Sequence, residues 1–245
     1  MENTQSPLRL LIFGGNGFVG TKVLELAVLR GAHCTCVSRT GAIPAHLTKE
    51  KRAWVDQVVW LAGDASQPAP ELFAAADVVI SLVGSAPVPT SSGSAFQQQL
   101  LLNGEANCAV INMAHRQGVK RLVLMSAHIP ALMQSQCFAY YVGKQQALAA
   151  AKQFSETSAE HAITVIRPSA IYGTRHTGGG AAIPLTPLMA PIAGLMRMLP
   201  KKLVAVLPES PVPLYKVAST VVDAALSPSC EPSFTLIENQ QLLAR

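Results

Sequence analysis

Three side chains in the middle of the chain have the types and spacing needed for proton transfer. Tyr140 and Lys144 are four residues apart, which places both on one face of a helix. A neighbouring ammonium lowers the pKa of a phenol, so we expect Tyr140 to act as the proton donor of a catalytic site. Ser126, fourteen residues before Tyr140, ends an expected strand, and its hydroxyl would face the same cleft. The alternative is that Tyr140 is only a half-buried aromatic residue beside the cleft.

A glycine-rich turn near the N-terminus has the pattern of a dinucleotide-binding loop. Gly15, Gly17 and Gly20 fit G-x-G-x-x-G, and Gly14 begins the related pattern G-x-x-G-x-x-G. The turn follows an apolar run and opens an amphipathic helix, so its N–H groups and the helix dipole can bind a pyrophosphate. We expect a side chain at Gly17 to block that space, and a positive φ there. A plain strand-to-helix turn is the alternative. The residues expected to bind the cofactor are Gly14, Gly15, Asn16, Gly17, Phe18, Val19 and Gly20.

The end of the second expected strand favours NADP over NAD. An acidic residue about 20 positions after the glycine turn would accept a hydrogen bond from the ribose 2′-hydroxyl of NAD. The sequence there is Val37-Ser-Arg-Thr40 instead. Ser38 and Arg39 are suited to a 2′-phosphate. An exposed Arg39 without a ligand is the alternative.

Two further strand ends are expected to contact the cofactor. Asp64 follows the third strand and can accept a hydrogen bond from the adenine amino group, or else cap a helix. Val83 and Gly84 end the fourth strand, where small residues let a cofactor approach the backbone. With Lys144 also binding the nicotinamide ribose, these residues predict one continuous cofactor site.

The elements that must position these residues alternate between apolar runs and helical stretches, which predicts an α/β fold with a doubly wound, Rossmann-type parallel sheet. The runs are nearly continuous in apolar residues, as in strands buried on both faces. The expected strands are 8–13, 33–38, 58–62, 78–83, 122–126 and 163–167. Helices are expected at about 17–30, 70–76, 95–117 and 138–157, with Gly118 as a C-terminal cap.

The sequence changes character after Tyr172. We expect one NAD(P)-binding domain over 1–245, with its Rossmann core at about 8–172 and a small, helical, Pro-rich substrate or partner region at about 173–245. Within that region, 181–198 is apolar but contains Pro184, Pro187 and Pro191, which disfavours a straight transmembrane helix. It is either a substrate lid or membrane-touching flap, or a Pro-broken pair of helices packed on the sheet.

Composition narrows the classes of partner. The 245 residues are 49% hydrophobic and 13% charged, which excludes a disordered or low-complexity chain. The net charge of +5 comes from scattered basic residues, so no nucleic-acid-binding stripe is expected. This charge favours anionic small molecules or membranes, or reflects ordinary solubility. Five cysteines without paired spacing indicate a reducing compartment rather than disulfides or zinc.

Six segments of the chain resemble the atypical short-chain dehydrogenases/reductases. They are similar in particular to a mitochondrial group that contains a coenzyme Q biosynthesis accessory protein and a nucleotide-binding accessory subunit of respiratory complex I. The segments are 13–20, 38–41, 103–107, 118–127, 140–144 and 167–173. The resemblance implies cofactor contacts at Arg167 and Pro168, and a place on the matrix side of the mitochondrial inner membrane beside membrane-complex subunits. No import signal is visible, so a chain without one would be cytoplasmic.

Departures from the family pattern leave two functions open. In the family, the motif before the catalytic residues usually begins with asparagine, and this chain has Leu101 at that position. Asn103 could replace the asparagine only if the helix is shifted. One hypothesis is an NADP(H)-dependent oxidoreductase acting on a carbonyl or quinone-related substrate, in which Tyr140 is the acid, Lys144 assists it and Ser126 orients the carbonyl. The other is a non-catalytic nucleotide-binding accessory or assembly subunit of a mitochondrial respiratory or coenzyme Q complex.

Overall fold

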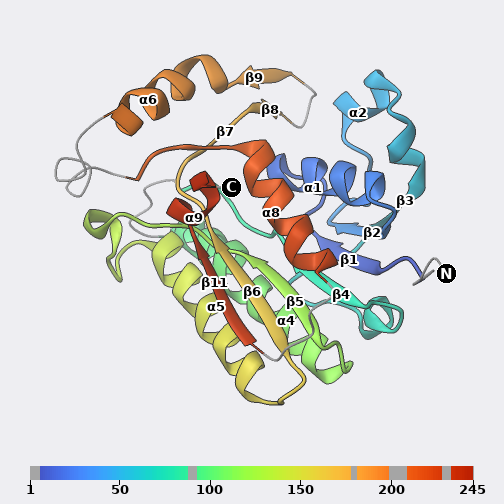
Figure 1. The fold of residues 1–245 in the computed structure, drawn as a ribbon. Coiled ribbons are helices and arrows are strands. Elements are labelled where there is room, and N and C mark those ends of the chain that lie inside the picture. The colour runs from blue at the N-terminus through green and yellow to red at the C-terminus, as the bar shows by residue number, and fades with distance from the viewer. Residues whose placement is uncertain (1–5, 88–92, 178–180, 199–208, 228–232, 245) are drawn as a thin grey trace.

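A parallel sheet of seven strands forms the centre of the molecule (Figure 1). The computed structural model describes residues 6–87, 93–177, 181–198, 209–227 and 233–244. Across the sheet the strands follow the order β11-β6-β5-β4-β1-β2-β3. Their bounds are β1 Arg9–Phe13, β2 His33–Ser38, β3 Val58–Ala62, β4 Val78–Ser81, β5 Arg121–Met125, β6 Ala162–Arg167 and β11 Ser233–Glu238. This is the doubly wound, Rossmann-type order, so the predicted fold class is confirmed.

The six predicted strands are present, two with the predicted ends and four with ends that differ by one or two residues. The seventh, β11, was not predicted because only Ile237 of its six residues is buried. It pairs with β6 in parallel from Ser233 beside Ala162 to Glu238 beside Arg167. An edge strand that is partly exposed lacks the continuous apolar run of a central strand.

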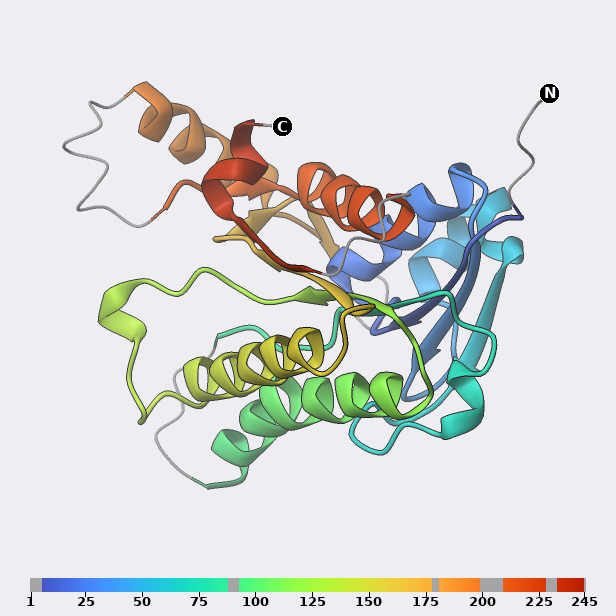
Figure 2. The ribbon, with the colours of Figure 1, turned by 60° about the horizontal axis from the view of Figure 1, so that its bottom comes forward.

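Helices cover both faces of the sheet (Figure 2). On one face, α1 (Phe18–Leu29) packs against α8 (Leu214–Leu226). On the other face, α4 (Ala106–Arg116) packs against α5 (Ala139–Glu156). Each pair buries its own apolar cluster against the strands. The sheet is therefore covered by apolar side chains on both sides, as a parallel sheet requires.

Two predicted helices differ in detail. The stretch predicted at 70–76 is only a short 3-10 helix, η2 (Pro70–Phe73). The stretch predicted at 95–117 runs through α3 (Gly93–Leu100), a π-helical turn η3 (Leu101–Glu105) and α4. Gly118 follows α4 with a φ of 73°, which confirms its role as a C-terminal cap. Before α5, three short helices of the described residues were not predicted: α2 (Ala45–Glu50), η1 (Ala53–Gln57) and η4 (Ala131–Met133).

Two elements beyond residue 172, α8 and β11, complete the central fold. Between β6 and α8 the chain forms a small unit with a β8–β9 hairpin and a short parallel pair, β7–β10. The remaining elements are β7 Ile171–Tyr172, β8 Thr174–His176, β9 Ala182–Pro184, α6 Thr186–Met198, β10 Val212–Pro213 and α9 Asn239–Ala244. The chain returns to the central sheet after this small unit, and local sequence patterns do not reveal such a return.

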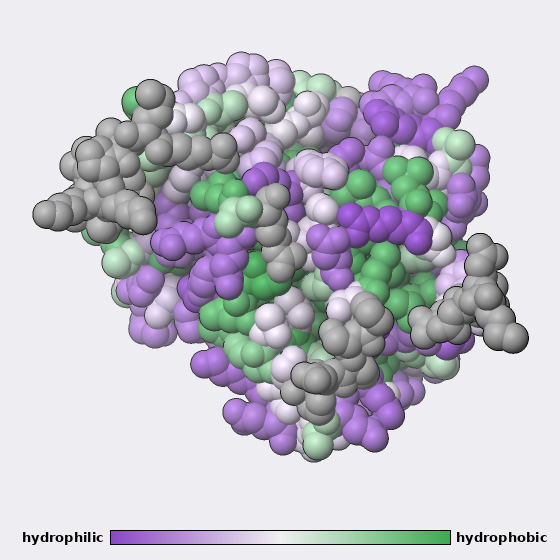
Figure 3. Space-filling model, viewed as in Figure 1, coloured by the Kyte–Doolittle hydropathy of each residue, from purple (hydrophilic) through white to green (hydrophobic). Residues whose placement is uncertain are grey.

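The segment 181–198 forms one strand and one helix rather than two helices. Pro191 lies inside α6. The side chains of Leu188 and Leu195 are each 63% exposed, while Ala193 is buried. None of the helices described is long and apolar enough to cross a membrane. Over the face seen in Figure 3, hydrophobic residues gather near the middle of the molecule and hydrophilic residues lie along the lower and upper right edges.

Two glycines bring α5 close to the π-helical turn. A Cβ atom on Gly104 would lie 2.8 Å from the Cα of Gly143, and one on Gly143 would lie 2.9 Å from the amide nitrogen of Gly104. Both separations are too short for non-bonded atoms. The packing of these two backbones therefore depends on the absence of side chains, and it positions the part of α5 that carries Lys144.

We expect Gly143→Ala to lower the free energy of unfolding by about 1–3 kcal/mol, because the added methyl forces α5 away from the π-helical turn. Urea unfolding followed by circular dichroism measures this change. Gly194→Ala in α6 is the matched control, since a Cβ there has no atom within 4 Å. Equal stability of the Gly143 variant and the wild type would show that the crossing tolerates a methyl group.

Candidate functional site

The carboxyl ends of the strands converge on one cleft of about 580 Å³. The glycine turn after β1 lines one part of it, and the segments after β4, β5 and β6 line the others. Strand order reverses between β1 and β4, since β1 pairs with β2 on one side and with β4 on the other. Ligands of open α/β sheets bind at such a reversal. The cleft lies where the fold favours a nucleotide.

The glycine turn has the close backbone approaches of a phosphate loop. A Cβ on Gly20 would lie 2.6 Å from the Cα of Gly15, so α1 can begin directly against the turn only with glycine there. The positive φ belongs to Gly14, at 77°. Gly17 has a φ of −81°, so the expectation of a positive φ at Gly17 is wrong. A Cβ on Gly17 would lie 3.2 Å from the carbonyl oxygen of Gly14, a tight but possible contact.

The N-terminus of α1 is suited to an anion. Its N-cap residue, Gly17, has no side chain to cap the helix, and no acidic residue lies in the first turn. The first N–H groups of a helix have no partner within the helix, and its dipole is positive at this end. Phe18, Val19, Gly14, Gly17 and Gly20 all line the cleft. These residues fit the pyrophosphate of a dinucleotide.

The end of β2 lies beside the glycine turn, because the Gly14 amide donates to the carbonyl of Val37. Arg39 is exposed there, and Ser38 is buried, with its Oγ accepting from the Gly41 amide. Asp64 accepts from the Ser66 amide at 2.8 Å. Hydrogen bonding with Ser66 is the main cause that holds the pKa of Asp64 below its usual range, and the positive charge of Arg39 has a smaller effect in the same direction. Asp64 thus caps a turn rather than a helix, and a basic side chain lies near it.

Lys144 is buried at the centre of the site. The residue is only 5% exposed, and its Nζ donates to the carbonyl oxygen of Met125 at 3.2 Å. Burial lowers the pKa of Lys144 to about 8. Nζ lies 5.8 Å from the centre of the Tyr140 ring, so the two side chains share one end of the cleft.

Tyr140 is also largely enclosed. Burial raises the pKa of its phenol to about 12, which is opposite to the acidification expected from Lys144. The cause is desolvation, which disfavours the charged phenolate. Ser126, 6% exposed, lines the same cleft, and its amide donates to the Ile166 carbonyl. The structure therefore brings the three predicted catalytic residues to one cavity, with the phenol protonated at neutral pH.

The π-helical turn supplies the shift that Asn103 needs to reach the site. Leu101 is 37% exposed, whereas Asn103 is fully buried. The Asn103 side chain accepts from the Ser85 amide at 3.2 Å and donates to the Ser85 hydroxyl at 2.9 Å. A Cβ on Gly84 would lie 3.1 Å from Asn103 Oδ1 and 3.4 Å from Lys144 Nζ. Asn103 thus orders the loop after β4 next to Lys144.

The remaining predicted residues divide into two groups. Val83, Gly84 and Pro168 line the cleft. Arg167 does not line it: its guanidinium donates to the Ala127 carbonyl and to Glu238, so it ties β6 to its neighbours. The other predicted cofactor residues that do not line this cavity are Gly15, Asn16, Ser38, Arg39 and Asp64.

Sequence reasoning missed several residues of the site. Asn107 is fully buried, accepts from Ser81 Oγ and donates to the Val83 carbonyl, so it joins α4 to the end of β4. Its four-residue spacing from Asn103 was a usable signal. His128 and Glu209 also line the cleft, and Glu209 is too far along the chain for any local signal. Among the described residues, no group of three side chains is arranged to hold a metal ion.

Comparisons with known proteins agree with this geometry. A family model described as NAD(P)H-binding matches residues 14–188. An uncharacterized chloroplastic protein of Arabidopsis thaliana is 33% identical over 175 residues, which are 70% of this chain and 53% of that protein. MIOREX complex component 2 of Saccharomyces cerevisiae is 37% identical over 60 residues, or 24% of this chain and 22% of that protein. The matches thus span about half, or less, of the curated relatives.

Solved structures share the fold at low sequence identity. An oxidoreductase of the short-chain dehydrogenase/reductase family from Burkholderia thailandensis has a TM-score of 0.65 and 15% identity, over 98% of this chain and 94% of that one. Gre2 from Candida albicans, in complex with NADPH, has a TM-score of 0.66 and 15% identity, over 94% and 78%. UDP-glucuronic acid 4-epimerase from Bacillus cereus, in complex with NAD, has a TM-score of 0.65 and 14% identity, over 94% and 76%.

We expect Gly17→Val to fold but to bind NADPH at least 10-fold more weakly, because its side chain would fill the space in front of the helix N-terminus that a phosphate needs. Isothermal titration calorimetry measures the affinity, and thermal unfolding checks the fold. Gly194→Val, at a helical glycine with open space around it, is the control. Wild-type affinity in the folded Gly17 variant would place the nucleotide elsewhere.

Proposed function

The chain belongs to the NAD(P)H-binding family, and we propose that it is an NADP(H)-dependent oxidoreductase that acts on a carbonyl or quinone-related substrate. The observation that carries the proposal is that Tyr140, Lys144 and Ser126 line the same cleft as the glycine turn. A proton donor and a dinucleotide site in one cavity are the two parts that hydride transfer to a carbonyl requires.

The chain's own residues would hold the dinucleotide along the carboxyl ends of the strands. The glycine turn and the first turn of α1 bind the pyrophosphate, and Val83, Gly84 and Pro168 border the nicotinamide half. Lys144 Nζ donates to the nicotinamide ribose in addition to the Met125 carbonyl. Arg39 pairs with the 2′-phosphate at the other end, with Ser38 shaping the turn that presents it. NADPH, when bound, supplies the hydride.

Proton transfer is assigned to Tyr140. Its phenol, with a pKa of about 12, keeps its proton at neutral pH and donates it to the substrate oxygen as negative charge develops there. Lys144, with a pKa of about 8, carries its proton for most of the time at pH 7 and stabilises the resulting phenolate. The Ser126 hydroxyl donates to the same oxygen and orients the carbonyl. Asn103 positions the loop beside Lys144.

A second candidate function is an accessory or assembly subunit of a mitochondrial membrane complex. The outward face of α6 favours this second function, because Leu188, Ile192 and Leu195 are all exposed. The outer face of a surface helix is normally polar. The sequence between Glu160 and Glu209 contains no acidic residue and five lysines or arginines, which suits an anionic membrane surface. An organellar location, mitochondrial by resemblance, is part of this proposal, and the names of the two curated relatives support it.

We expect the wild type to bind NADPH more tightly than NADH, and Arg39→Ala to reduce this preference by about 1–3 kcal/mol, because the variant loses a charge-assisted contact to the 2′-phosphate. Calorimetry with both cofactors measures the difference. Arg116→Ala, an exposed arginine at the end of α4, is the control. Equal affinities of the wild type for NADPH and NADH would refute the assignment.

Tyr140→Phe should lower the rate of NADPH oxidation by about 100-fold or more, because no proton is delivered as the hydride moves. Its affinity for NADPH should remain close to that of the wild type. Tyr141→Phe is the control, since its side chain points about 100° away around the helix. Rescue of respiratory growth in a deletion strain by Tyr140→Phe, together with failure of Gly17→Val, would favour the accessory function.

The double variant Leu188→Asp and Leu195→Asp should bind vesicles of phosphatidylcholine and phosphatidylglycerol about 10-fold more weakly than the wild type, if α6 lies in the membrane surface. Co-sedimentation measures the bound fraction. Leu29→Asp on α1, where the leucine is 70% exposed, controls for the effect of charge. Absence of binding by the wild type would leave α6 without this role.

A further inference from the structure

A histidine and a glutamate on the wall of the cleft have no part in the proton transfer described above. His128 lies two residues after Ser126, and Glu209 lies just before β10. His128 Nδ1 and Glu209 Oε2 are 3.6 Å apart, and both side chains line the cavity that Tyr140 and Lys144 line. They are 26% and 21% exposed. The cleft therefore has a second polar group besides the predicted catalytic residues.

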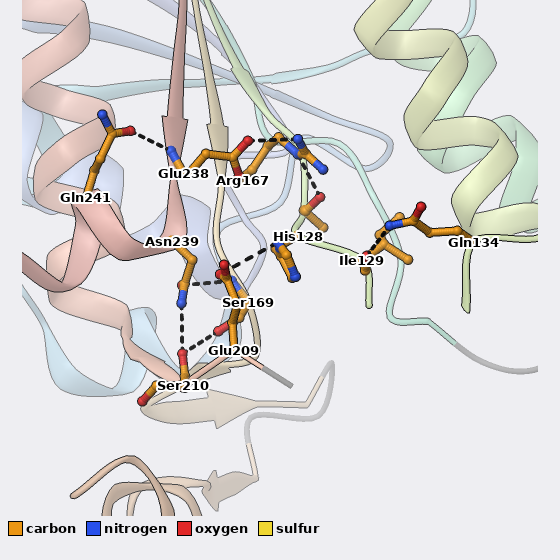
Figure 4. A network of polar contacts seen from close by, with 11 residues as sticks. His128, Ile129, Gln134, Arg167, Ser169, Glu209, Ser210, Glu238, Asn239 and Gln241 are labelled. Carbon is orange, nitrogen blue, oxygen red and sulfur yellow. Dashed lines mark hydrogen bonds and ion pairs between the residues drawn. The ribbon is translucent and has the colours of Figure 1, made fainter. Parts of the chain in front are cut away.

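Hydrogen bonds hold the two loops that carry this pair (Figure 4). The His128 amide donates to the Pro168 carbonyl at 2.8 Å. Ser169 Oγ donates to the carbonyl of Ser210, the neighbour of Glu209, at 2.6 Å. Both side chains thus extend from backbone that is bonded to the same segment after β6.

Asn239, at the start of α9, completes this support. It is fully buried, accepts from the Ser169 amide at 2.9 Å and donates to the Ser210 carbonyl at 2.9 Å. The C-terminal helix thereby fixes the place of Glu209, although it lies outside the cleft. Groups that bind a ligand precisely are commonly held by such a surrounding network.

The carboxylate of Glu209 is incompletely satisfied. Its Oε2 atom is enclosed and has no hydrogen-bond partner among the residues that the structure describes, and 3.6 Å from a ring nitrogen is longer than a hydrogen bond. A carboxylate next to Nδ1 favours the tautomer with its proton on that nitrogen, which leaves Nε2 of His128 as an acceptor. The pair is therefore arranged to receive a hydrogen bond from a donor on a ligand.

Most of the surface of the cleft is apolar, although Ser169 and Arg175 also line it. Ile129, Pro130, Met133, Ile171 and Leu185 line the cleft around the pair. Such a wall gives few hydrogen bonds to a sugar and much contact area to a hydrocarbon. Building on the proposed oxidoreductase function, we infer that the substrate is an apolar carbonyl compound that carries a hydroxyl group, which donates to His128 while the carbonyl faces Tyr140.

A matched pair of probes tests this inference. Acetophenone and 3-hydroxyacetophenone differ only in a hydroxyl group, and their affinities for the protein can be measured by calorimetry. In these titrations the protein is saturated with NADP⁺ in place of NADPH, because the oxidised cofactor has no hydride to transfer to a ketone. The wild type should bind the hydroxylated ketone about 10-fold more tightly, the gain of one hydrogen bond to a group fixed by a carboxylate. His128→Leu should abolish this preference and leave the affinity for acetophenone nearly unchanged. His128→Gln, which keeps an acceptor, should restore part of it.

Two further variants separate ligand binding from structure. Glu209→Gln should reduce the preference several-fold, because it no longer fixes the tautomer of His128. His33→Leu, at an exposed histidine outside the cleft, should keep the full preference. Equal affinity of the wild type for both ketones, or binding of neither, with NADP⁺ bound, overturns the inference and leaves the proposed function intact. Failure to bind NADPH overturns the proposed function itself.

Discussion

The reversal of strand order between β1 and β4 is the constraint on which the site depends. The connection after β1 runs toward β2 on one side and the connection after β4 runs toward β5 on the other, so the two loops diverge at the carboxyl ends. The opening is bordered by the glycine turn after β1 and by the loops after β4 and β5. All residues with proposed chemical roles in the cleft come from segments that the sheet brings to this edge.

Close backbone contacts convert this opening into a defined site. Gly20 lets α1 begin against the glycine turn, and Gly104 and Gly143 let α5 approach the π-helical turn. The second contact places Lys144 where its ammonium reaches the Met125 carbonyl at 3.2 Å. Burial disfavours the charged ammonium and lowers the pKa of Lys144 to about 8. The same enclosure raises the pKa of Tyr140, so its phenol holds its proton at neutral pH.

Buried asparagines join the loops of the site to the helices. Asn103 binds the loop after β4, Asn107 binds the end of that strand, and Asn239 binds the segments at Ser169 and Ser210. Each amide both donates and accepts, so one side chain can satisfy two backbone groups that would otherwise be unpaired. These hydrogen bonds thus tie loops that bear polar groups of the cleft to the helices.

The sequence by itself determined the features that depend on neighbouring residues. Six strands follow from their apolar runs, because both faces of a parallel sheet are buried, and the glycine turn follows from its place between a strand and a helix. The four-residue spacing of Tyr140 and Lys144 was enough to place them on one helix face. These features are local, so periodicity and backbone preference reveal them.

Only the tertiary structure decided the features that depend on distant contacts. The edge strand β11 exists because β6 offers it a hydrogen-bonding partner, and α8 returns to the core after an insertion that looked like a separate region. The π-helical turn that buries Asn103 is set by packing against Gly143. The protonation of Tyr140 and Lys144 reflects desolvation, and Glu209 meets His128 across 81 residues of sequence, because burial and long-range packing have no signature within a short stretch of chain.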